Sequence, residues 1–238
     1  MTVRSVPWWG LVSSAMAPVL LACGWAVAAG LQPGSFDAVS QTISALASDG
    51  AADRWVMTGA LLGVGACYAL TGLALRPAAP AGRLILIVAG IACILVAATP
   101  EPTEGGGSLA HGVWATSCFI ALTVWPAASW RRGSGVPWGL RPVVSVSAAG
   151  VMLGLLAWFE AELITGSGQT GLAERILAET LAVWPLIVML TAAAGRTTGL
   201  TGRRPSLPRP RSRAGRPQSV QPEGPAPGRY GPACGGPG

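Results

Sequence analysis

The chain has 238 residues, of which 51% are hydrophobic and only 11% are charged, and its formal net charge is +6. An ordinary soluble domain has about 25% charged residues, so this chain has too few charges to cover a water-exposed surface. All sixteen cationic residues are arginines, and they gather in the C-terminal segment and in short connections between apolar runs. This distribution argues against a basic surface that reads nucleic acid, and we expect no nucleic-acid partner.

Six apolar runs are long enough, or nearly long enough, to cross a bilayer, which takes about 20 mostly apolar residues in a helix. We predict spans at residues 8–31, 55–75, 84–99, 112–130, 143–159 and 176–194. The third and fifth runs are short, so we expect them to borrow flanking residues or the bilayer to thin locally. The predicted fold is all-α, a polytopic transmembrane bundle of about six helices that occupies residues 1–195.

The arginine positions predict the orientation of the bundle. With the N-terminus inside, fourteen arginines lie on the cytoplasmic side and only Arg54 and Arg175 lie outside, in agreement with the positive-inside rule. Both termini are then cytoplasmic (N-in/C-in), and most acidic residues fall in the three outer loops. We expect a multi-pass protein of the cell membrane, the plasma membrane of a bacterium.

The composition changes abruptly after the last apolar run. Residues 196–238 contain nine prolines, nine glycines and eight arginines. Such a segment buries too little apolar surface to offset its ordering entropy, so we predict a disordered cytoplasmic tail. Its arginines would attract anionic lipid headgroups, at about 1 kcal/mol per charge near the surface. A solvated tail without a specific partner is the simpler interpretation, and a regulatory lipid switch is the alternative.

The first outer loop contains the most informative polar pattern. Residues 37–47 are predicted to form a short helix, with Asp37 as its N-cap. Ser40 and Ser44 lie one turn apart beside the apolar stripe of this helix. The helix could lie across the outer mouth of the bundle and contribute to a site, or it could be an interfacial connector, which is the more common case.

His111 is the only histidine of the chain, and it begins the fourth span directly after an acidic loop. Near Glu101, Glu104 or Asp53 it could accept a proton or supply one metal ligand. A single histidine with no cysteine partner does not make a metal site, and we predict no metal and no cofactor. An ordinary polar residue at the membrane interface is the competing interpretation, and the more common one.

Arg175 and Glu179 stand four residues apart at the start of the last span, so they can pair on one helix face. Charges inside a membrane cost about 2.5–3.5 kcal/mol on insertion scales and usually face a cavity or a partner. Glu179 is only one or two turns deep, however, and could instead reach the surface. The candidate binding residues are Asp37, Ser40, Ser44, Asp53, His111, Arg175 and Glu179, and we assign no catalytic residue.

Four segments carry a resemblance to one family of prokaryotic membrane proteins. They are Val6-Pro7-Trp8-Trp9, Thr42-Ile43-Ser44-Ala45-Leu46, Arg54-Trp55-Val56-Met57 and Ala110-His111-Gly112. Over roughly residues 5–195 the chain resembles the uncharacterised six-span family called domain of unknown function 998, in an actinobacterial form. The resemblance implies the six-span topology, and it brings no reaction, substrate or catalytic residue.

Two main classes of function remain open. The first, which we favour, is non-enzymatic: binding, sensing or transport of a small molecule or lipid through a polar outward-facing site, with membrane lipids as partners. The second is a membrane-embedded hydrolase acting on lipid, similar in outline to the seven-span ceramidase-like superfamily. That superfamily uses a metal with several histidines, whereas this chain has one, so none of its residues is carried over. A purely structural role in the membrane is the remaining alternative.

Overall fold

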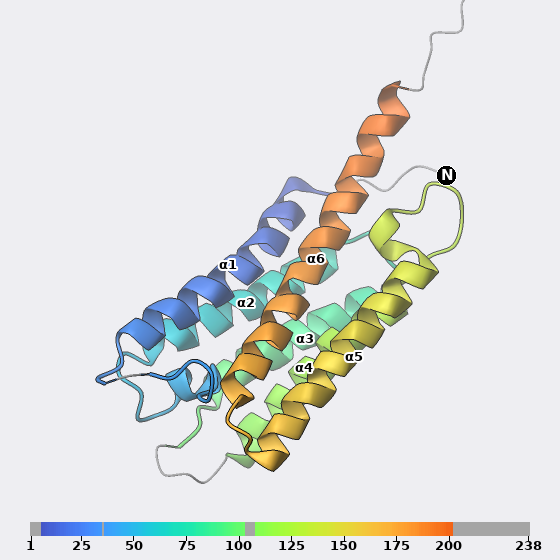
Figure 1. Ribbon diagram of the computed structural model, residues 1–238. Coiled ribbons are helices and arrows are strands. Elements are labelled where there is room, and N and C mark those ends of the chain that lie inside the picture. The colour runs from blue at the N-terminus through green and yellow to red at the C-terminus, as the bar shows by residue number, and fades with distance from the viewer. Residues whose placement is uncertain (1–5, 35, 103–107, 202–238) are drawn as a thin grey trace, which may run out of the picture. The chain divides into compact units, whose positions relative to one another are not determined.

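The computed structural model describes residues 6–34, 36–102 and 108–201 (Figure 1). Over these residues the secondary structure consists of helices joined by loops, without a strand. Six long helices and two short 3-10 helices follow one another: α1 (Trp8–Gly30), η1 (Ser44–Ala47), α2 (Trp55–Ala74), α3 (Pro80–Ala98), α4 (Leu109–Ser129), η2 (Trp138–Leu140), α5 (Pro142–Thr165) and α6 (Thr170–Thr201). All six long helices are long and apolar enough to cross a membrane, which confirms the predicted all-α, six-span architecture.

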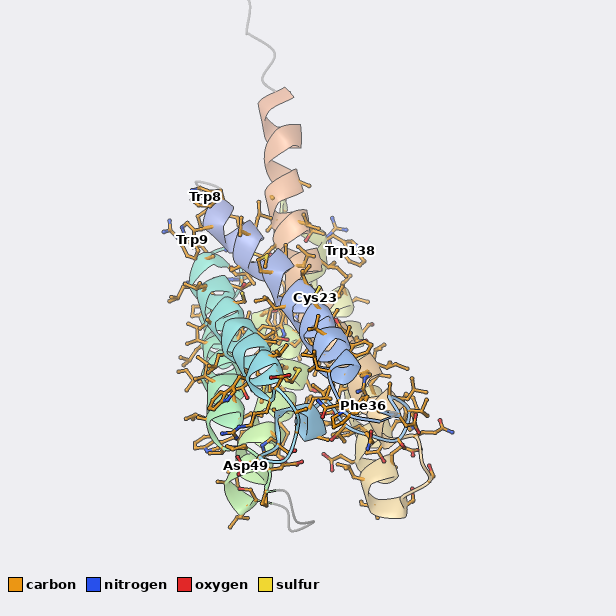
Figure 2. The ribbon with its side chains drawn as sticks, turned by 90° about the vertical axis from the view of Figure 1, so that its left-hand side faces the viewer. Trp8, Trp9, Cys23, Phe36, Asp49 and Trp138 are labelled. Atoms are coloured by element: carbon orange, nitrogen blue, oxygen red, sulfur yellow. The ribbon has the colours of Figure 1, made fainter. Side chains whose placement is uncertain are left out.

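The long helices form a closed ring in chain order. Each packs against the next, and α6 also packs against α1 (Figure 1). Successive helices run in opposite directions, so the start of α1 and the end of α6 lie at the same end of the bundle. The opposite end, here called the loop end, holds loop 31–54 and the connections that follow α3 and α5. Figure 2 shows Trp8 and Trp9 at the first end and Phe36 and Asp49 at the loop end.

Two helices are longer than the hydropathy pattern predicts. The third begins at Pro80 instead of residue 84, and the fifth continues to Thr165 instead of residue 159. Proline occupies the first turn of both helices, where its missing N–H is no loss. Gly166 ends α5 in the left-handed conformation, with φ of 63°. The added turns contain charged residues, which lower the local hydropathy without disfavouring a helix.

The last helix also extends beyond its predicted bounds. It begins at Thr170, six residues before the predicted start, and continues to Thr201. The predicted boundary between bundle and tail at residue 195 therefore falls inside α6. The predicted disorder of the tail and its attraction to anionic headgroups concern mainly residues 202–238, which lie outside the described residues.

Backbone contact between α2 and α3 depends on two small residues. A Cβ atom built on Gly65 would lie 2.6 Å from the carbonyl oxygen of Gly90, and one built on Gly90 would lie 2.5 Å from the carbonyl oxygen of Gly65. In membranes, such close approach supplies the packing energy that the hydrophobic effect supplies in water. Gly150 and Gly154 on α5 have no neighbour within 4 Å of a built Cβ, so they play no such part.

Candidate functional site

Loop 31–54 folds back over the loop end of the bundle and begins with a tight turn. The Asp37 carboxylate accepts the Ser40 hydroxyl at 2.6 Å and the Val39 N–H at 2.9 Å. These hydrogen bonds, the one from Ser40 first, lower the pKa of Asp37 below its ordinary value of 3.8. The predicted helix over residues 37–47 is wrong in extent, because only Ser44–Ala47 is helical, as a 3-10 turn. Local side-chain bonds of this kind compete with helix formation.

Arg175 attaches this loop to α6. It is only 6% exposed, and its Nη1 donates to the carbonyl oxygens of Ala38 at 2.8 Å and Gln41 at 2.7 Å. The guanidinium also lies over the rings of Trp25 and Phe36, at 5.0 and 5.4 Å from their centroids. Arg175 is therefore an anchor for the loop and is not presented to solvent.

The loop backbone lies directly on the first turn of α6. The Leu172 N–H donates to the Val39 carbonyl oxygen at 2.9 Å. A Cβ built on Gly171 would lie 2.1 Å from the carbonyl oxygen of Gln41, a distance that no side chain could tolerate. Because residue 171 is a glycine, the loop can lie close to α6, and this contact places Ser44 at the loop end of the bundle.

Four polar side chains meet beneath the loop; Ser44, Glu101, His111 and Glu174 are here called the polar cluster. His111 Nε2 lies 3.2 Å from Ser44 Oγ and 3.6 Å from Glu101 Oε1. Ser44 Oγ lies 3.5 Å from Glu174 Oε1. His111 and Glu174 are each 4% exposed, so these two side chains are screened from solvent, whereas the Glu101 side chain is 36% exposed.

The hydrogen bond at the other ring nitrogen fixes the tautomer of His111. Nδ1 lies 2.9 Å from the carbonyl oxygen of Thr99, and a carbonyl oxygen can only accept, so Nδ1 carries the hydrogen. In the neutral imidazole, Nε2 is then an acceptor directed at the Ser44 hydroxyl. The imidazole is thus oriented by the backbone at the end of α3.

Glu174 and Glu101 are held by the same loop. The Ile43 N–H makes a close hydrogen bond to Glu174 Oε2. The Asp49 N–H donates to the carbonyl oxygen of Glu101 at 2.9 Å. Loop 31–54 therefore organises both acids of the cluster through its backbone.

The structure brings some of the predicted site residues together and separates others. Ser44 and His111 are in contact, and Arg175 adjoins the cluster through its neighbour in sequence, Glu174. Asp37 and Ser40 are exposed and bond to each other, away from His111. Exposed Asp53 has a positive φ of 48° at the start of α2, and among the described residues its carboxylate contacts no member of the cluster.

Glu179 does not pair with Arg175, although their spacing allows it. It accepts the Trp25 indole N–H at 3.4 Å, while Arg175 is bonded to backbone carbonyls of the loop. The sequence analysis missed Glu174 as a site residue. Its only sequence signal is an acid directly before an arginine at the start of a span. Glu101, in contrast, was a predicted neighbour of His111 and is one.

An apolar cavity extends from the polar cluster into the bundle. Its volume is about 60 Å³, several times the roughly 10–15 Å³ that one water requires. Five helices and the loop line it: Leu21, Ile43, Ser44, Leu61, Val64, Tyr68, Cys93, Val96, Ala115, Cys118, Phe119, Leu122, Glu174, Ala178 and Leu181. Apart from the tyrosine hydroxyl and two thiols, its polar groups are confined to the cluster.

The depth of the cavity follows from the position of its lining residues on the helices. On α2 the lining residues run from Leu61 to Tyr68, a rise of roughly 10 Å at about 1.5 Å per residue. The cavity therefore covers about two to three helical turns along the bundle, and Ser44 and Glu174 stand at its loop end. Among the described residues, no group of three or more His, Cys, Asp or Glu side chains is placed to hold a metal ion.

Comparison with known proteins identifies one family. The sequence matches the family described as "Protein of unknown function (DUF998)" over residues 15–191. No curated protein and no solved structure matches the chain. The matched range contains the polar cluster, the cavity and most of all six long helices, in agreement with the resemblance seen in the sequence. The chain therefore belongs to the DUF998 family of membrane proteins.

Proposed function

We propose that the protein binds a lipid-like molecule with one slim apolar chain and a polar head, the chain in the cavity and the head at the polar cluster. The observation that carries this proposal is the joining of the two features: a narrow apolar cavity opens onto the hydroxyl of Ser44 and the carboxylate of Glu174. Small-molecule sites commonly combine apolar walls with a few convergent polar groups.

The physical chemistry of the cavity favours a hydrocarbon chain over water. A cavity lined by side chains such as Leu61, Val64 and Phe119 offers water few hydrogen-bond partners and tends to stay dry. A hydrocarbon chain gains contacts there without that loss. Ser44 and Glu174, which line the cavity, present a hydroxyl and a carboxyl group to the head of the ligand.

The predicted orientation defines where such a ligand would come from. With the N-terminus inside, the loop end faces the outside of the cell, so an outer-leaflet lipid or an amphipathic small molecule would enter there. Sensing or transport would both begin with this binding step.

Analysis of copurifying lipid tests the proposal. Protein purified in mild detergent is extracted, and the extract is analysed by mass spectrometry for amphipathic molecules present in near-stoichiometric amount. Ala178 lines the cavity, so Ala178→Phe fills it. We expect this variant to lose at least nine-tenths of the bound molecule.

Ala157→Phe is the matched control, because Ala157 lies on the exposed face of α5. It should retain the wild-type amount of ligand. Equal retention by both variants would show that bound lipid sits on the outside of the bundle, and the cavity would not be the binding site.

A further inference from the structure

We propose that Ser44 and His111 form a nucleophile–base pair that cleaves carboxylic esters whose acyl chain occupies the cavity. Substrate placement rests on the proposed function, whereas the reactive pair stands on its own geometry. Ser44 Oγ and His111 Nε2 are 3.2 Å apart, at the limit of the distance that a base needs to accept the hydroxyl proton.

A third group orients the base, as such a pair requires. The carbonyl oxygen of Thr99 accepts from Nδ1 at 2.9 Å, so in the neutral imidazole Nε2 is the acceptor that faces Ser44. This arrangement, in which a nucleophile is bonded to a base and a further hydrogen bond orients the base, is typical of an activated serine. Ser108 also contacts His111, but as the N-cap of α4, whose hydroxyl accepts the backbone N–H at 3.3 Å; Ser44 contacts the imidazole ring itself.

One carboxylate beside the pair, that of Glu101, suits the positive charge that develops on His111 in the reaction. Glu101 Oε1 lies 3.6 Å from His111 Nε2, so it can pair with the imidazolium that forms when the ring takes the serine proton. His111 is 4% exposed and the Glu101 side chain is 36% exposed, so water screens this pair only in part.

The location of Ser44 suits a chain-bearing substrate. It stands at the polar end of the cavity and is itself one of the lining residues. An acyl chain lying between the helices would bring its ester carbonyl to the level of Ser44, with the alcohol part towards the loop. The substrate class is therefore an ester of a single-chain fatty acid.

The reaction balances with water as the second substrate. Ser44 Oγ bonds to the ester carbonyl carbon while its proton passes to His111 Nε2. The carbon–oxygen bond to the alcohol then breaks, and the alcohol leaves with that proton. Water next attacks the acyl-serine and gives a proton to His111. The Oγ–carbon bond breaks, Oγ recovers the proton, and a carboxylic acid is released.

Labelling of the full-length purified protein with alkyl fluorophosphonates tests the pair. A reagent with an octyl chain and one with an ethyl chain are compared by intact mass and peptide mapping. We expect the octyl reagent to modify Ser44 in the wild-type protein. Ser44→Ala should remain unmodified, whereas Ser40→Ala, the same change at an exposed serine of the same loop, should react normally.

A second variant tests the base. His111→Gln keeps a polar side chain at the position but cannot take a proton, and we expect the labelling rate to fall by about 10²–10⁴-fold. Ser44→Cys should keep a reactive nucleophile and be alkylated by a chain-bearing iodoacetamide. Melting temperatures of all variants establish that they are folded, and a folded His111→Gln that labels at the wild-type rate would overturn the assignment of the base.

The remaining outcomes separate the two proposals. An absence of labelling at Ser44 with both reagents, in protein that still carries copurified lipid, would overturn the reactive pair and leave the binding function standing. Labelling of Ser44 by the ethyl reagent alone would support the pair and contradict chain binding in the cavity. Modification of a different serine would also refute the pair.

Discussion

At the scale of single residues, the two arginines of the loop end differ in their surroundings. Arg175 is buried and donates to backbone carbonyls of loop 31–54, whereas Arg54 makes an ion pair with Asp49 at the surface. Lysine cannot reproduce the planar fork and the stacking of a buried guanidinium. The loss of the arginine therefore leaves part-buried carbonyl oxygens unpaired at Arg175 and a solvated carboxylate unpaired at Arg54.

We expect Arg175→Lys to lower the free energy of unfolding by about 1–3 kcal/mol, because the buried carbonyl oxygen of Gly171 and the part-buried ones of Ala38 and Gln41 lose their donor. The Arg54→Lys control should change it by about 0–1 kcal/mol, since exposed ion pairs contribute little. Thermal unfolding in the same detergent measures both. Similar melting temperatures for the two variants would show that Arg175 does not anchor the loop.

Asp37 gives a prediction about pH. Its pKa is lowered chiefly by the Ser40 hydroxyl, so its ionised form stabilises the turn. A carboxyl group whose pKa is lower in the folded state adds stability above its unfolded value, 3.8 here. That stability is lost as the pH falls below this value. Ser40→Ala should raise the pKa of Asp37 towards 3.8, as measured by carboxyl-carbon NMR titration. An unchanged titration curve would mean that the hydroxyl does not make this bond in solution.

At the scale of helices, the sequence predicted the number and the position of the helices better than their lengths. All six spans were found, because a run of about 20 apolar residues is a local property that needs no tertiary information. The ends of α3 and α5 were placed too far inward, since their terminal turns contain Arg83, Glu160 and Glu162. Hydropathy measures transfer into lipid, whereas helix ends are set by capping and backbone geometry.

The predicted helix over residues 37–47 was wrong in extent for a different reason. A stretch with an N-cap residue and an apolar stripe favours a helix in isolation. In the protein, the carbonyl oxygens of Ala38 and Gln41 accept hydrogen bonds from Arg175 instead of from a helical backbone, and Asp37 closes a turn. Contacts with α6 therefore decide the backbone of this segment, and only the part that contains Ser44 is helical.

The close contact of α2 and α3 gives a test at this scale. A methyl group on Gly65 would meet the carbonyl oxygen of Gly90 at 2.6 Å, so Gly65→Ala should force the helices apart and cost about 1–3 kcal/mol. Gly150→Ala is the control, because nothing lies within 4 Å of its built Cβ, and alanine favours a helix over glycine. A melting temperature that falls for Gly65→Ala but not for Gly150→Ala would confirm the packing. An equal response would contradict it.

At the scale of the whole molecule, the orientation in the membrane remains a prediction from the arginines. Gly50 lies at the loop end and Ser134 at the opposite end, and both are exposed. In a variant without native cysteines, Gly50→Cys should react with a membrane-impermeant maleimide in intact cells. Ser134→Cys should react only after the cells are opened. The reverse pattern would place the polar cluster on the cytoplasmic side.

The sequence by itself determined the class of protein, the number of helices and the family. These follow from composition, from hydropathy summed over single segments and from short motifs, all of which are local. It also picked out Ser44, in the first outer loop, and His111, at the start of a span, as members of one candidate site, although it gave no reason to pair these two with each other.

Only the tertiary structure decided which polar residues meet. Ser44 and His111 are 67 residues apart, and Ser44 and Glu174 are 130 apart, so no periodicity in the sequence relates them. Their contact depends on the ring closure of α6 onto α1, on the absence of a side chain at Gly171 and on the anchor at Arg175. The same contacts leave Asp53 exposed and Glu179 bonded to Trp25. A site made of distant segments exists only once those segments have packed, because packing alone fixes the distances between their side chains.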